Sequence, residues 1–465
     1  MATPEHFDYV SLGSGEAGKY IAWTLASQHG KRCAVIEREW IGGSCPNVAC
    51  LPSKNFVHSA ALAHDFRQAA AYGLGAFVAG GADAVKADVA AAKHRKADMV
   101  DGLVQMHLGK FADTGVELIR GEGRFVGPKI VQVGGRLLTG DAVVVNTGSR
   151  AVVDARIPGL VEAKPLTHVE ILDLEQLPAH LIILGGGYVG MEFAQAFRRF
   201  GSQVTVIEKH DHVLAKEDKD IVDALVEIVA GEGVHFVTSA RVEQVTGVSG
   251  STAEFTVKAG GKTSKIAGSH ILAAAGRIPN TENIGLEEAG IKLTSSGHVH
   301  VDEQLRTTVD GVFAVGDCAG SPHFTHIGFD DFRVVLSYLT GSPRPGGTSG
   351  RQVPSTLYTS PELAHVGLRE HEAEAQGIRY RLAKLPMAAF LRTRTFGDTR
   401  GFAKALVEAD GDKILGFTAL GPSAGEMLPV VQLAMKLGIS YKEIANLIIT
   451  HPTMCEGLVA LFGSI

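Results

Sequence analysis

The sequence predicts an α/β protein with two Rossmann-like dinucleotide-binding domains followed by a C-terminal α+β domain. The first observation is a strand, a glycine turn, a helix and a second strand, expected at 7–12, 13–18, 19–29 and 32–37. The second is the return of this order at 181–184, 185–190, 191–200 and 203–208. The third is an alternation of strand-like and helical segments over residues 351–465.

The domain boundaries are expected where turns and loops interrupt the pattern. At 465 residues the chain is too long for one compact core. We expect a helix over 82–110, a new strand at 298–301 and a Gly/Pro/Ser-rich linker at 341–350. The predicted segments are 1–150 and 276–345 for one dinucleotide domain, 151–275 for the other and 346–465 for the C-terminal domain.

Composition and charge exclude several classes of protein. A formal charge of −6 offers no electrostatic reason to bind nucleic acid. No run of eighteen apolar residues occurs and the first residues show no signal peptide, so we expect a cytoplasmic protein that does not enter a membrane. Of five cysteines only Cys45 and Cys50 are close in sequence, and in a reducing compartment such a pair is more often catalytic or metal-binding than structural.

The first glycine turn has the pattern of a dinucleotide site. Gly13, Gly15 and Gly18 form G-x-G-x-x-G, and Glu37 ends the next strand 19 residues later. The glycines permit a tight turn and close approach of a pyrophosphate, while the acid binds a ribose.

The second glycine turn repeats the pattern. It consists of Gly185, Gly187 and Gly190, and Glu208 follows 18 residues later. Two complete fingerprints predict two dinucleotides, assigned as FAD and NAD(P)H. Glu208 favours NADH because a 2′-phosphate would meet a carboxylate, but Lys209 and His210 could soften the repulsion, so NADPH stays possible.

Cys45 and Cys50 are separated by four residues. In an ideal helix their Cα atoms would be about 8.7 Å apart, farther than the roughly 7 Å that a disulfide spans. A bridge therefore requires a distorted turn, and a distorted bridge is easier to reduce. Two buried small residues would be the alternative explanation, but the position directly after a dinucleotide-binding turn favours a redox relay.

These motifs resemble those of a known family. The run Gly43-Ser44-Cys45, Asn47, Cys50 and Pro52-Ser53-Lys54 is similar to the active-site signature of the pyridine nucleotide-disulfide oxidoreductases, the flavoproteins that include dihydrolipoamide dehydrogenase, glutathione reductase and mercuric reductase. Residues 307–317 resemble the second flavin motif, which ends in Gly316 and Asp317. The other turns that match nucleotide-contacting turns of the family are Thr147-Gly148-Ser149 and Gly276-Arg277. The resemblance covers essentially the whole chain.

The resemblance implies roles for residues near the flavin. Cys50 would lie against the flavin as a thiolate, and Cys45 would attack the substrate. Lys54 and Glu192 would form an ion pair beside the reactive nitrogen of the flavin, and Tyr188 would gate the nicotinamide pocket.

The resemblance also implies a shared active site. His451, oriented by Glu456, is similar to the family's base motif, in which the histidine comes from the partner subunit. A thiol relay needs a proton acceptor of near-neutral pKa. We therefore expect a homodimer joined through the C-terminal domain.

Some features separate this chain from particular members. Residues 1–465 show neither the vicinal cysteine tail nor the amino-terminal metal-binding domain of many mercuric reductases, so we do not expect efficient handling of mercury. Residues 324–333 and Gly18-Lys19 resemble the reactive-chlorine-resistance flavoprotein branch, implicated in copper(II) reduction. We expect Asp330 and Asp331 to be a solvated helix face and Cys455 to be a buried small residue.

The prediction is an FAD-dependent NAD(P)H oxidoreductase that acts on a disulfide or dithiol substrate, without a resident metal site. The first alternative is a reductase of Hg(II) or Cu(II). An alternative of another class is a docking subunit of a multienzyme complex.

Overall fold

The computed structural model describes residues 3–78 and 88–465, and the chain divides into two compact units. The first unit contains Met1–Phe56, Ala91–Val152 and Gly276–Arg351. The second contains Val57–Ala90, Val153–Ala275 and Gln352–Ile465. The assignment of four segments to three domains stays a prediction.

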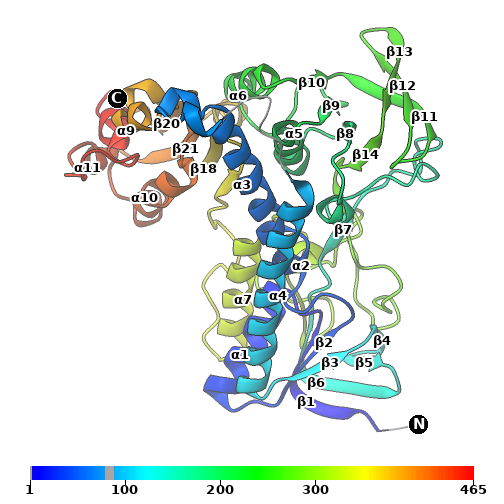
Figure 1. Cartoon of the computed structure of the whole chain (residues 1–465). Coiled ribbons are helices and arrows are strands. Elements are labelled where there is room, and N and C mark those ends of the chain that lie inside the picture. The colour runs from blue at the N-terminus through cyan, green and yellow to red at the C-terminus, as the bar shows by residue number, and fades with distance from the viewer. Residues whose placement is uncertain (1–2, 79–87) are drawn as a thin grey trace. The chain divides into compact units, whose positions relative to one another are not determined.

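A mixed sheet lies at the centre of the first unit, with the strand order β3-β2-β1-β6-β5-β4 (Figure 1). Its strands are β1 (Glu5–Leu12), β2 (Cys33–Glu37), β3 (Glu117–Arg120), β4 (Gly123–Gly127), β5 (Ile130–Val133) and β6 (Arg136–Val145). A further strand, β16 (Val312–Ala314), pairs in parallel with the end of β6. Because β1, β2, β6 and β16 are parallel, their carboxyl ends share one edge, which is where polar ligands bind in such sheets.

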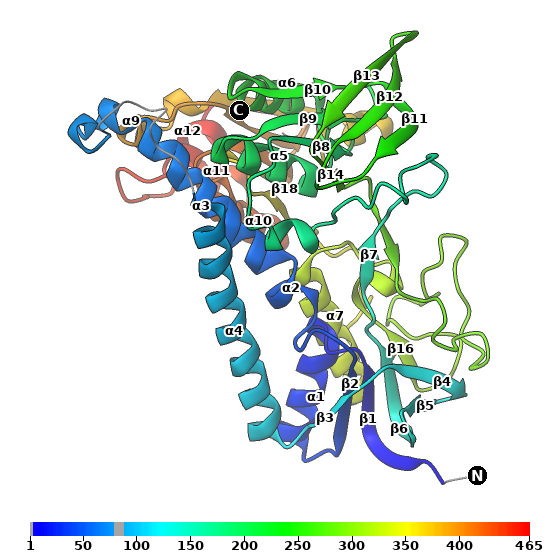
Figure 2. The ribbon, with the colours of Figure 1, turned by 45° about the vertical axis from the view of Figure 1, so that its right-hand side comes forward.

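Three helices cover one face of this sheet: α1 (Glu16–His29), α4 (Val89–Thr114) and α7 (Thr325–Leu339). Helices α1 and α7 lie side by side (Figures 1 and 2). Trp23 of α1 meets Phe111 of α4 edge to face, with ring centroids 5.1 Å apart. Tyr9 of β1 belongs to this helical core, while Val10 and Leu12 belong to the core on the other side. Both faces of the sheet are therefore buried at β1, as is typical of a parallel strand covered on both sides.

The remaining elements of the first unit surround the carboxyl edge of the sheet. They are α2 (Ser44–Asn47), the start of α3 (Cys50–Arg67), the strand pair β7 (Ser149–Ala151) and β15 (Arg277–Pro279), and the 3₁₀ turn η5 (Gly316–Ala319).

The second unit begins with a parallel sheet in the order β10-β9-β8-β14. Its elements are β8 (His180–Leu184), α5 (Tyr188–Phe200), β9 (Gln203–Ile207), α6 (Lys219–Gly231), β10 (Val234–Val237) and β14 (His270–Ala273). An antiparallel sheet follows in the chain, made of β11 (Ala240–Gly247), β12 (Ala253–Ala259) and β13 (Lys262–Gly268).

An antiparallel sheet in the order β17-β18-β21-β20-β19 organises residues 352–465. Its strands are β17 (Ser355–Leu357), β18 (Glu362–Gly367), β19 (Tyr380–Pro386), β20 (Phe402–Glu408) and β21 (Ile414–Gly421). Its helices are α8 (Glu370–Ala375), α9 (Leu391–Phe396), α10 (Ala424–Leu437), α11 (Tyr441–Ala445) and α12 (Gly457–Phe462). The second unit also contains the 3₁₀ turns η1 (Ala69–Tyr72), η2 (Gly75–Phe77), η4 (Glu170–Asp173) and η6 (Met387–Ala389).

The predicted strand–turn–helix–strand units are both present, and the mixed α/β fold is confirmed. The helix expected at 82–110 is α4, which runs from Val89 to Thr114, while residues 82–87 lie outside the described residues. The strand expected at 298–301 is wrong. Only Val299 forms a single bridge, to Leu293, because no neighbouring backbone continues the ladder. The predicted linker at 341–350 contains neither helix nor strand.

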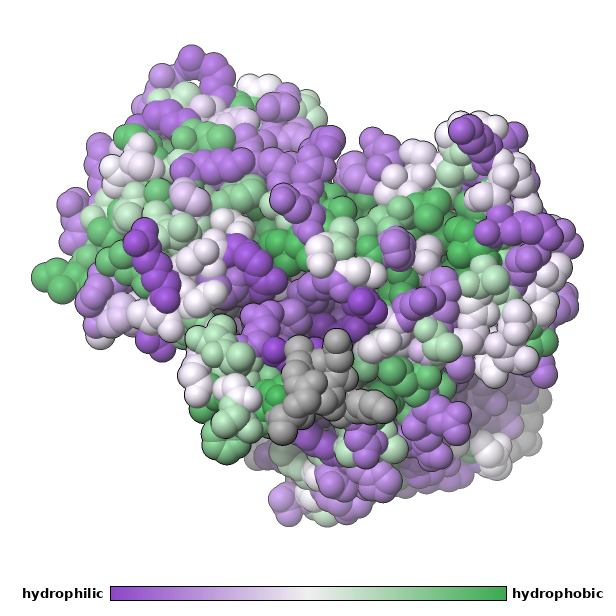
Figure 3. Space-filling view, turned by 45° about the horizontal axis from the view of Figure 1, so that its top comes forward, coloured by the Kyte–Doolittle hydropathy of each residue, from purple (hydrophilic) through white to green (hydrophobic). Residues whose placement is uncertain are grey.

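Among the residues that the structure describes, no helix is long and apolar enough to cross a membrane. Figure 3 shows hydrophilic side chains interspersed with hydrophobic ones over the face that it draws.

Candidate functional site

The first glycine turn joins β1 to α1 and leaves no room for side chains at Gly13 and Gly18. Gly13 has φ +106°, and a Cβ there would lie 2.3 Å from the carbonyl oxygen of Asn146. A Cβ on Gly18 would lie 2.3 Å from Ser11 Oγ. The side chain of Asn146 accepts the Gly18 N–H at 2.9 Å, so this buried amide, which the sequence analysis missed, ties β6 to the turn.

Glu37, at the end of β2, is buried against the glycine turn. Its Oε2 accepts the backbone N–H of Ser14 at 2.9 Å and the Ser14 hydroxyl at 2.6 Å. Its Oε1 accepts the backbone N–H groups of Glu39 and Trp40 at 2.8 and 3.1 Å. Glu37, which the sequence analysis predicts to bind a ribose, therefore also connects the glycine turn to the segment after β2.

The residues around this turn fit FAD. Helix α1 begins after Gly15, which has no side chain to cap it, and Asn146 accepts only the Gly18 N–H, so the start of the helix can bind a pyrophosphate. Gly43 has φ +85°, and a Cβ there would lie 2.7 Å from the Cα of Gly15. The hydroxyl of Thr147 is buried without a hydrogen-bond partner among the described residues. An uncapped helix, a close glycine contact and an unsatisfied hydroxyl are what a bound dinucleotide would explain.

Strands β7 and β15 bring the predicted turns 147–149 and 276–277 together with Asp317. The Ser149 hydroxyl donates to Asp317 Oδ2. Arg277 donates from Nε to Ser149 Oγ and from Nη2 to the Ser149 carbonyl, both at 2.8 Å. Gly148 and Gly316 have φ of +66° and +67°, which explains glycine at both turns.

The helix is interrupted between the two cysteines, which is the distortion that a disulfide between them would require. Helix α2 ends at Asn47, and α3 begins at Cys50, so an irregular turn lies between the two cysteines. Both residues are thiols in the structure. The Asn47 side-chain amide donates to the carbonyls of Ile41 and Gly43 at 2.9 and 2.7 Å and holds the loop before Cys45.

Lys19 supports the same loop from α1. Its side chain is buried, and Nζ donates to the Gly42 carbonyl at 2.9 Å and to Glu16 at 2.6 Å. A buried lysine with both a carbonyl and a carboxylate is a structural tie between the first helix and the cysteine loop.

The two thiols differ in their surroundings. Cys50 Sγ lies 3.1 Å from the hydroxyl of Thr325, the first residue of α7. The pKa of Cys45 is raised by its hydrogen bond with Cys50 and by burial. A hydroxyl donor and the positive end of a helix dipole both stabilise a thiolate. Thr325 also lowers the pKa of Cys45, but the hydrogen bond with Cys50 and burial outweigh this effect, so the net shift favours Cys50 as the site of negative charge. Thr325 is a residue that the sequence analysis missed.

The second glycine turn joins β8 to α5. A Cβ on Gly190 would lie 2.0 Å from the Gly185 carbonyl, so helix and turn are in direct contact. Gly187 differs, because its backbone is extended and a Cβ there would meet nothing within 4 Å. Neither backbone strain nor packing requires glycine at 187, but close approach of a nicotinamide dinucleotide would. The residues therefore fit this cofactor.

Glu208 directly follows β9 and is buried beside the second turn. Its Oε2 accepts the Gly186 N–H at 2.7 Å and its Oε1 accepts the His210 N–H at 2.9 Å. This arrangement matches that of Glu37 at the first turn.

Tyr188 and Glu192 lie on the first turns of α5. The Tyr188 hydroxyl is 3.0 Å from Glu217 Oε1 and 3.2 Å from Ser355 Oγ. Burial and the nearby carboxylate raise the pKa of Tyr188. Glu192 is buried and accepts the backbone N–H of Tyr358 at 3.0 Å. The ion pair of Glu192 with Lys54 and the gating role of Tyr188 stay predictions.

His451 and Glu456 lie between α11 and α12 and form the predicted pair. The Nδ1 atom of His451 lies 2.9 and 3.0 Å from the two Glu456 oxygens. A proton on Nδ1 leaves Nε2 as the acceptor. The imidazole is 62% exposed, so Nε2 is accessible to a substrate or a partner.

Asp330 and Asp331 are not a solvated helix face, so that expectation is wrong. The Asp331 side chain is 0% exposed and pairs with Arg351, and Asp330 pairs with Arg344 at 2.7 Å. Arg344 and Arg351 both lie in the segment that follows α7. The pairing with Arg351 keeps the Asp331 side chain buried. Cys455 is half-buried, and burial raises its pKa.

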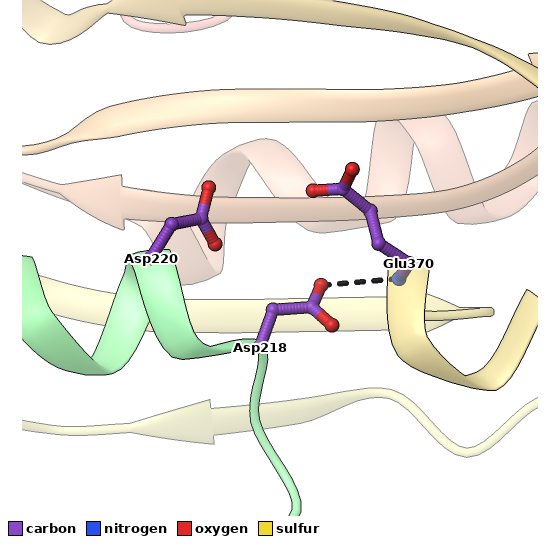
Figure 4. A group of neighbouring side chains, drawn as sticks. All are labelled: Asp218, Asp220 and Glu370. Atoms are coloured by element: carbon purple, nitrogen blue, oxygen red, sulfur yellow. Dashed lines mark hydrogen bonds between the residues drawn. The ribbon is translucent and has the colours of Figure 1, made fainter. Parts of the chain in front are cut away.

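Asp218, Asp220 and Glu370 gather in the second unit with their oxygens within 4.8 Å of one another (Figure 4). The backbone N–H of Glu370 donates to Asp218, which is the dashed contact in Figure 4. The ammonium of the buried Lys404 lies 2.8, 2.8 and 2.6 Å from the three carboxylates. Lys404 is thus a cation that contacts all three carboxylates, and the arrangement argues for a structural tie between α6, α8 and β20.

Comparison with known proteins agrees with this geometry. Residues 7–331 match the family model "Pyridine nucleotide-disulphide oxidoreductase", and residues 353–462 match the dimerisation domain of the same family. The chain is 34% identical to the probable pyridine nucleotide-disulfide oxidoreductase RclA of Escherichia coli (strain K12), over 98% of this chain and 99% of that protein. It is 31% identical to the mitochondrial dihydrolipoyl dehydrogenase of Pisum sativum, over 97% and 90%.

A solved structure described as the Cu(II) complex of the HOCl-induced flavoprotein disulfide reductase RclA from Escherichia coli superposes with a TM-score of 0.89. It is 33% identical and covers 99% of this chain and 100% of its own. The chain therefore belongs to the pyridine nucleotide-disulfide oxidoreductases, flavoproteins that use FAD and NAD(P)H.

Proposed function

We propose that this enzyme passes electrons from NADH through FAD and the Cys45–Cys50 pair to a disulfide substrate. The observation that carries the proposal is the unequal pair of thiols at an interrupted helix. Cys50 has the Thr325 hydroxyl at 3.1 Å, and Cys45 has a raised pKa. The glycine contact between Gly15 and Gly43 sets this pair beside the turn that fits FAD.

The cofactor supplies the link between nicotinamide and thiols. Bound FAD would take a hydride from NAD(P)H and return two electrons to the disulfide form of the cysteine pair. The Cys45–Cys50 pair is then in its reduced, dithiol form. Side chains of the protein carry out the remaining steps.

The substrate step is two successive thiol–disulfide exchanges. The Cys45 thiolate attacks one sulfur of the substrate, forms a mixed disulfide and releases the first substrate thiolate. The Cys50 thiolate then attacks Cys45 Sγ, which closes the Cys45–Cys50 disulfide and releases the second thiolate. Each substrate disulfide takes up two electrons and two protons.

His451 would move the proton in these exchanges. Its Nε2 would accept the Cys45 proton before attack and return it to the first leaving thiolate, while Glu456 holds Nδ1 and stabilises the imidazolium. The match to the dimerisation domain supports a homodimer, in which this group is His451 of the partner subunit.

Glu208 supports NADH as the preferred nicotinamide. Its carboxylate accepts the Gly186 N–H at the second glycine turn, where it could also accept hydrogen bonds from a ribose diol and would repel a 2′-phosphate.

A second candidate is reduction of a soft metal ion. The structural relative described as a Cu(II) complex supports this candidate. Two neighbouring thiolates can bind such a cation, and two Cu(II) ions would take one electron each as the pair closes to a disulfide.

Variants of the two cysteines test the proposal. We expect Cys45→Ser and Cys50→Ser to lose NADH-dependent reduction of lipoamide and glutathione disulfide, while NADH still bleaches the flavin absorbance. Cys33→Ala is the control, because Cys33 is a buried thiol of β2 in the same unit. Full turnover in Cys50→Ser would refute the relay. Reduction of Cu(II) or Hg(II), without any disulfide reduction, by the wild-type enzyme would favour the second candidate.

A further inference from the structure

Helix α7 carries an aspartate, Asp331, whose two carboxylate oxygens both accept hydrogen bonds inside the protein. Asp331 Oδ2 accepts the backbone N–H of Gly316 at 2.7 Å and the hydroxyl of Ser321 at 2.8 Å. Its Oδ1 accepts from Arg351 Nη1 at 2.5 Å. A buried charge requires such partners, because it is costly to remove from water without them.

Two of these partners belong to the turn that carries Asp317. Gly316 opens η5 with φ +67°, and Ser321 follows the end of that turn. Asp331 therefore binds the Gly316 backbone before Asp317 and the Ser321 side chain after it. The carboxylate of Asp317 is then aimed through its contact with Ser149 and its neighbour Arg277.

Arg351 keeps the Asp331 carboxylate in place. Its Nη2 lies 3.2 Å from Ser321 Oγ and its Nη1 lies 3.4 Å from Asp330 Oδ2. The arginine side chain is only 12% exposed. Arg351 therefore contacts the carboxylate and the far side of the turn at the same time.

The same helix also reaches the redox pair. Thr325, at the start of α7, contacts Cys50, and Asp331 lies six residues later, about 9 Å along the helix axis. One rigid element is thus attached to the thiol at its first residue and to the Asp317 turn in its second turn.

We propose that Asp331 and Arg351 are positioning residues for FAD, which set the Gly316–Asp317 turn relative to Cys50. This inference rests on the proposed FAD site. It predicts that the loss of the Asp331 charge weakens flavin binding and changes the spacing of flavin and thiolate. Asp331 itself does not have to touch the cofactor.

Asp331→Asn and Asp330→Asn form a matched pair of variants. They are neighbours on one helix. Asp330 binds mainly Arg344, at 2.7 Å, and lies 3.4 Å from Arg351, but only Asp331 contacts the turn. We expect FAD release from Asp331→Asn holoenzyme to be at least about tenfold faster than from wild type. For Asp330→Asn we expect a change below about twofold. Release is followed by the rise in free-flavin fluorescence after dilution.

A second readout separates positioning from a general loss of stability. At saturating FAD, reduction by NADH should give a weaker long-wavelength thiolate–flavin absorption band in Asp331→Asn, and an unchanged band in Asp330→Asn. If Asp331→Asn does not fold, Ser321→Ala removes one bond to the same carboxylate and should show the same order of effects. An Asp331→Asn holoenzyme with wild-type release and band would overturn the inference and leave the proposed function intact. A wild-type chain that binds no FAD would overturn both.

Discussion

Replacement of Lys404 by methionine should strongly destabilise the second unit. The ammonium of Lys404 is fully buried and is the cation shared by Asp218, Asp220 and Glu370. Methionine keeps much of the volume but leaves three carboxylates facing one another. Removal of one partner of a buried ion pair costs about 3–5 kcal/mol. Because 1 kcal/mol shifts the Tm of a large domain by roughly 2–4 °C, the expected drop is about 10 °C.

The pH dependence of the loss of stability in Lys404→Met identifies the cause of that loss. In the wild type, burial raises the pKa of Asp218, but hydrogen bonds from Lys404 and His371 outweigh it and bring the pKa well below its usual value. The stabilisation by this carboxylate is thus present above about pH 3.9 and is lost only in stronger acid. In Lys404→Met burial acts without the ammonium, so protonation relieves the repulsion. The gap in Tm between wild type and variant should therefore narrow from pH 7 to pH 4.

Differential scanning fluorimetry across this pH range is the assay, with Lys384→Met as the control. Lys384 contacts only Asp220 of the three acids, at 2.6 Å, and is 44% exposed, so its loss should cost less than about 1 kcal/mol. Millimolar Ca²⁺ should raise the Tm of Lys404→Met but not of wild type, because the three carboxylates supply oxygen ligands. Equal Tm values for the two methionine variants would refute the reasoning.

Three further predictions concern the cofactor, the base and acid stability. Glu208→Gln should narrow the preference for NADH over NADPH by about tenfold, or ~1.4 kcal/mol, in the ratio of kcat/KM values, and an unchanged ratio would contradict the role of Glu208. His451→Gln should slow disulfide reduction by about 100-fold or more without slowing flavin reduction by NADH, as stopped-flow absorbance would show; equal slowing of both steps would argue against a proton role. Burial lowers the pKa of His365 to about 4, so the unfolded chain binds this proton first and stability falls as pH drops from 6.5 towards 4. Denaturant unfolding should show about 2 kcal/mol lost at pH 5, and His365→Gln should flatten this dependence.

The local parts of the two nucleotide sites could be predicted from the sequence. Residues 7–12 are mostly apolar and 181–184 are entirely apolar, and each run is followed by a glycine in a left-handed conformation, Gly13 and Gly185. These signals are local because a buried strand and a tight turn are specified by a few neighbouring residues. The distortion between Cys45 and Cys50 was also predictable, since a regular helix holds their Cα atoms too far apart.

Errors arose where a local pattern was ambiguous. The alternation of histidine and valine at 298–301 is typical of a strand, but a strand needs a neighbour, and only Val299 found one. Two adjacent aspartates on a helix are usually solvated, but Arg344 and Arg351 turn Asp330 and Asp331 into buried or half-buried ion pairs. The signal that could have helped is the pair of arginines in the segment after α7.

By itself the sequence determined the family and the two glycine turns, and it predicted the redox role of Cys45 and Cys50, because each depends on residues close together in the chain. Only the tertiary structure decided which distant residues contact Cys50 and the buried carboxylates. Thr325 meets Cys50 across 275 residues, and Lys404 meets Asp220 across 184. Such contacts follow from the packing of a helix or strand onto a distant segment, and the energy of a buried charge or thiolate depends on that packing. The unequal character of the two thiols is therefore a property of the fold.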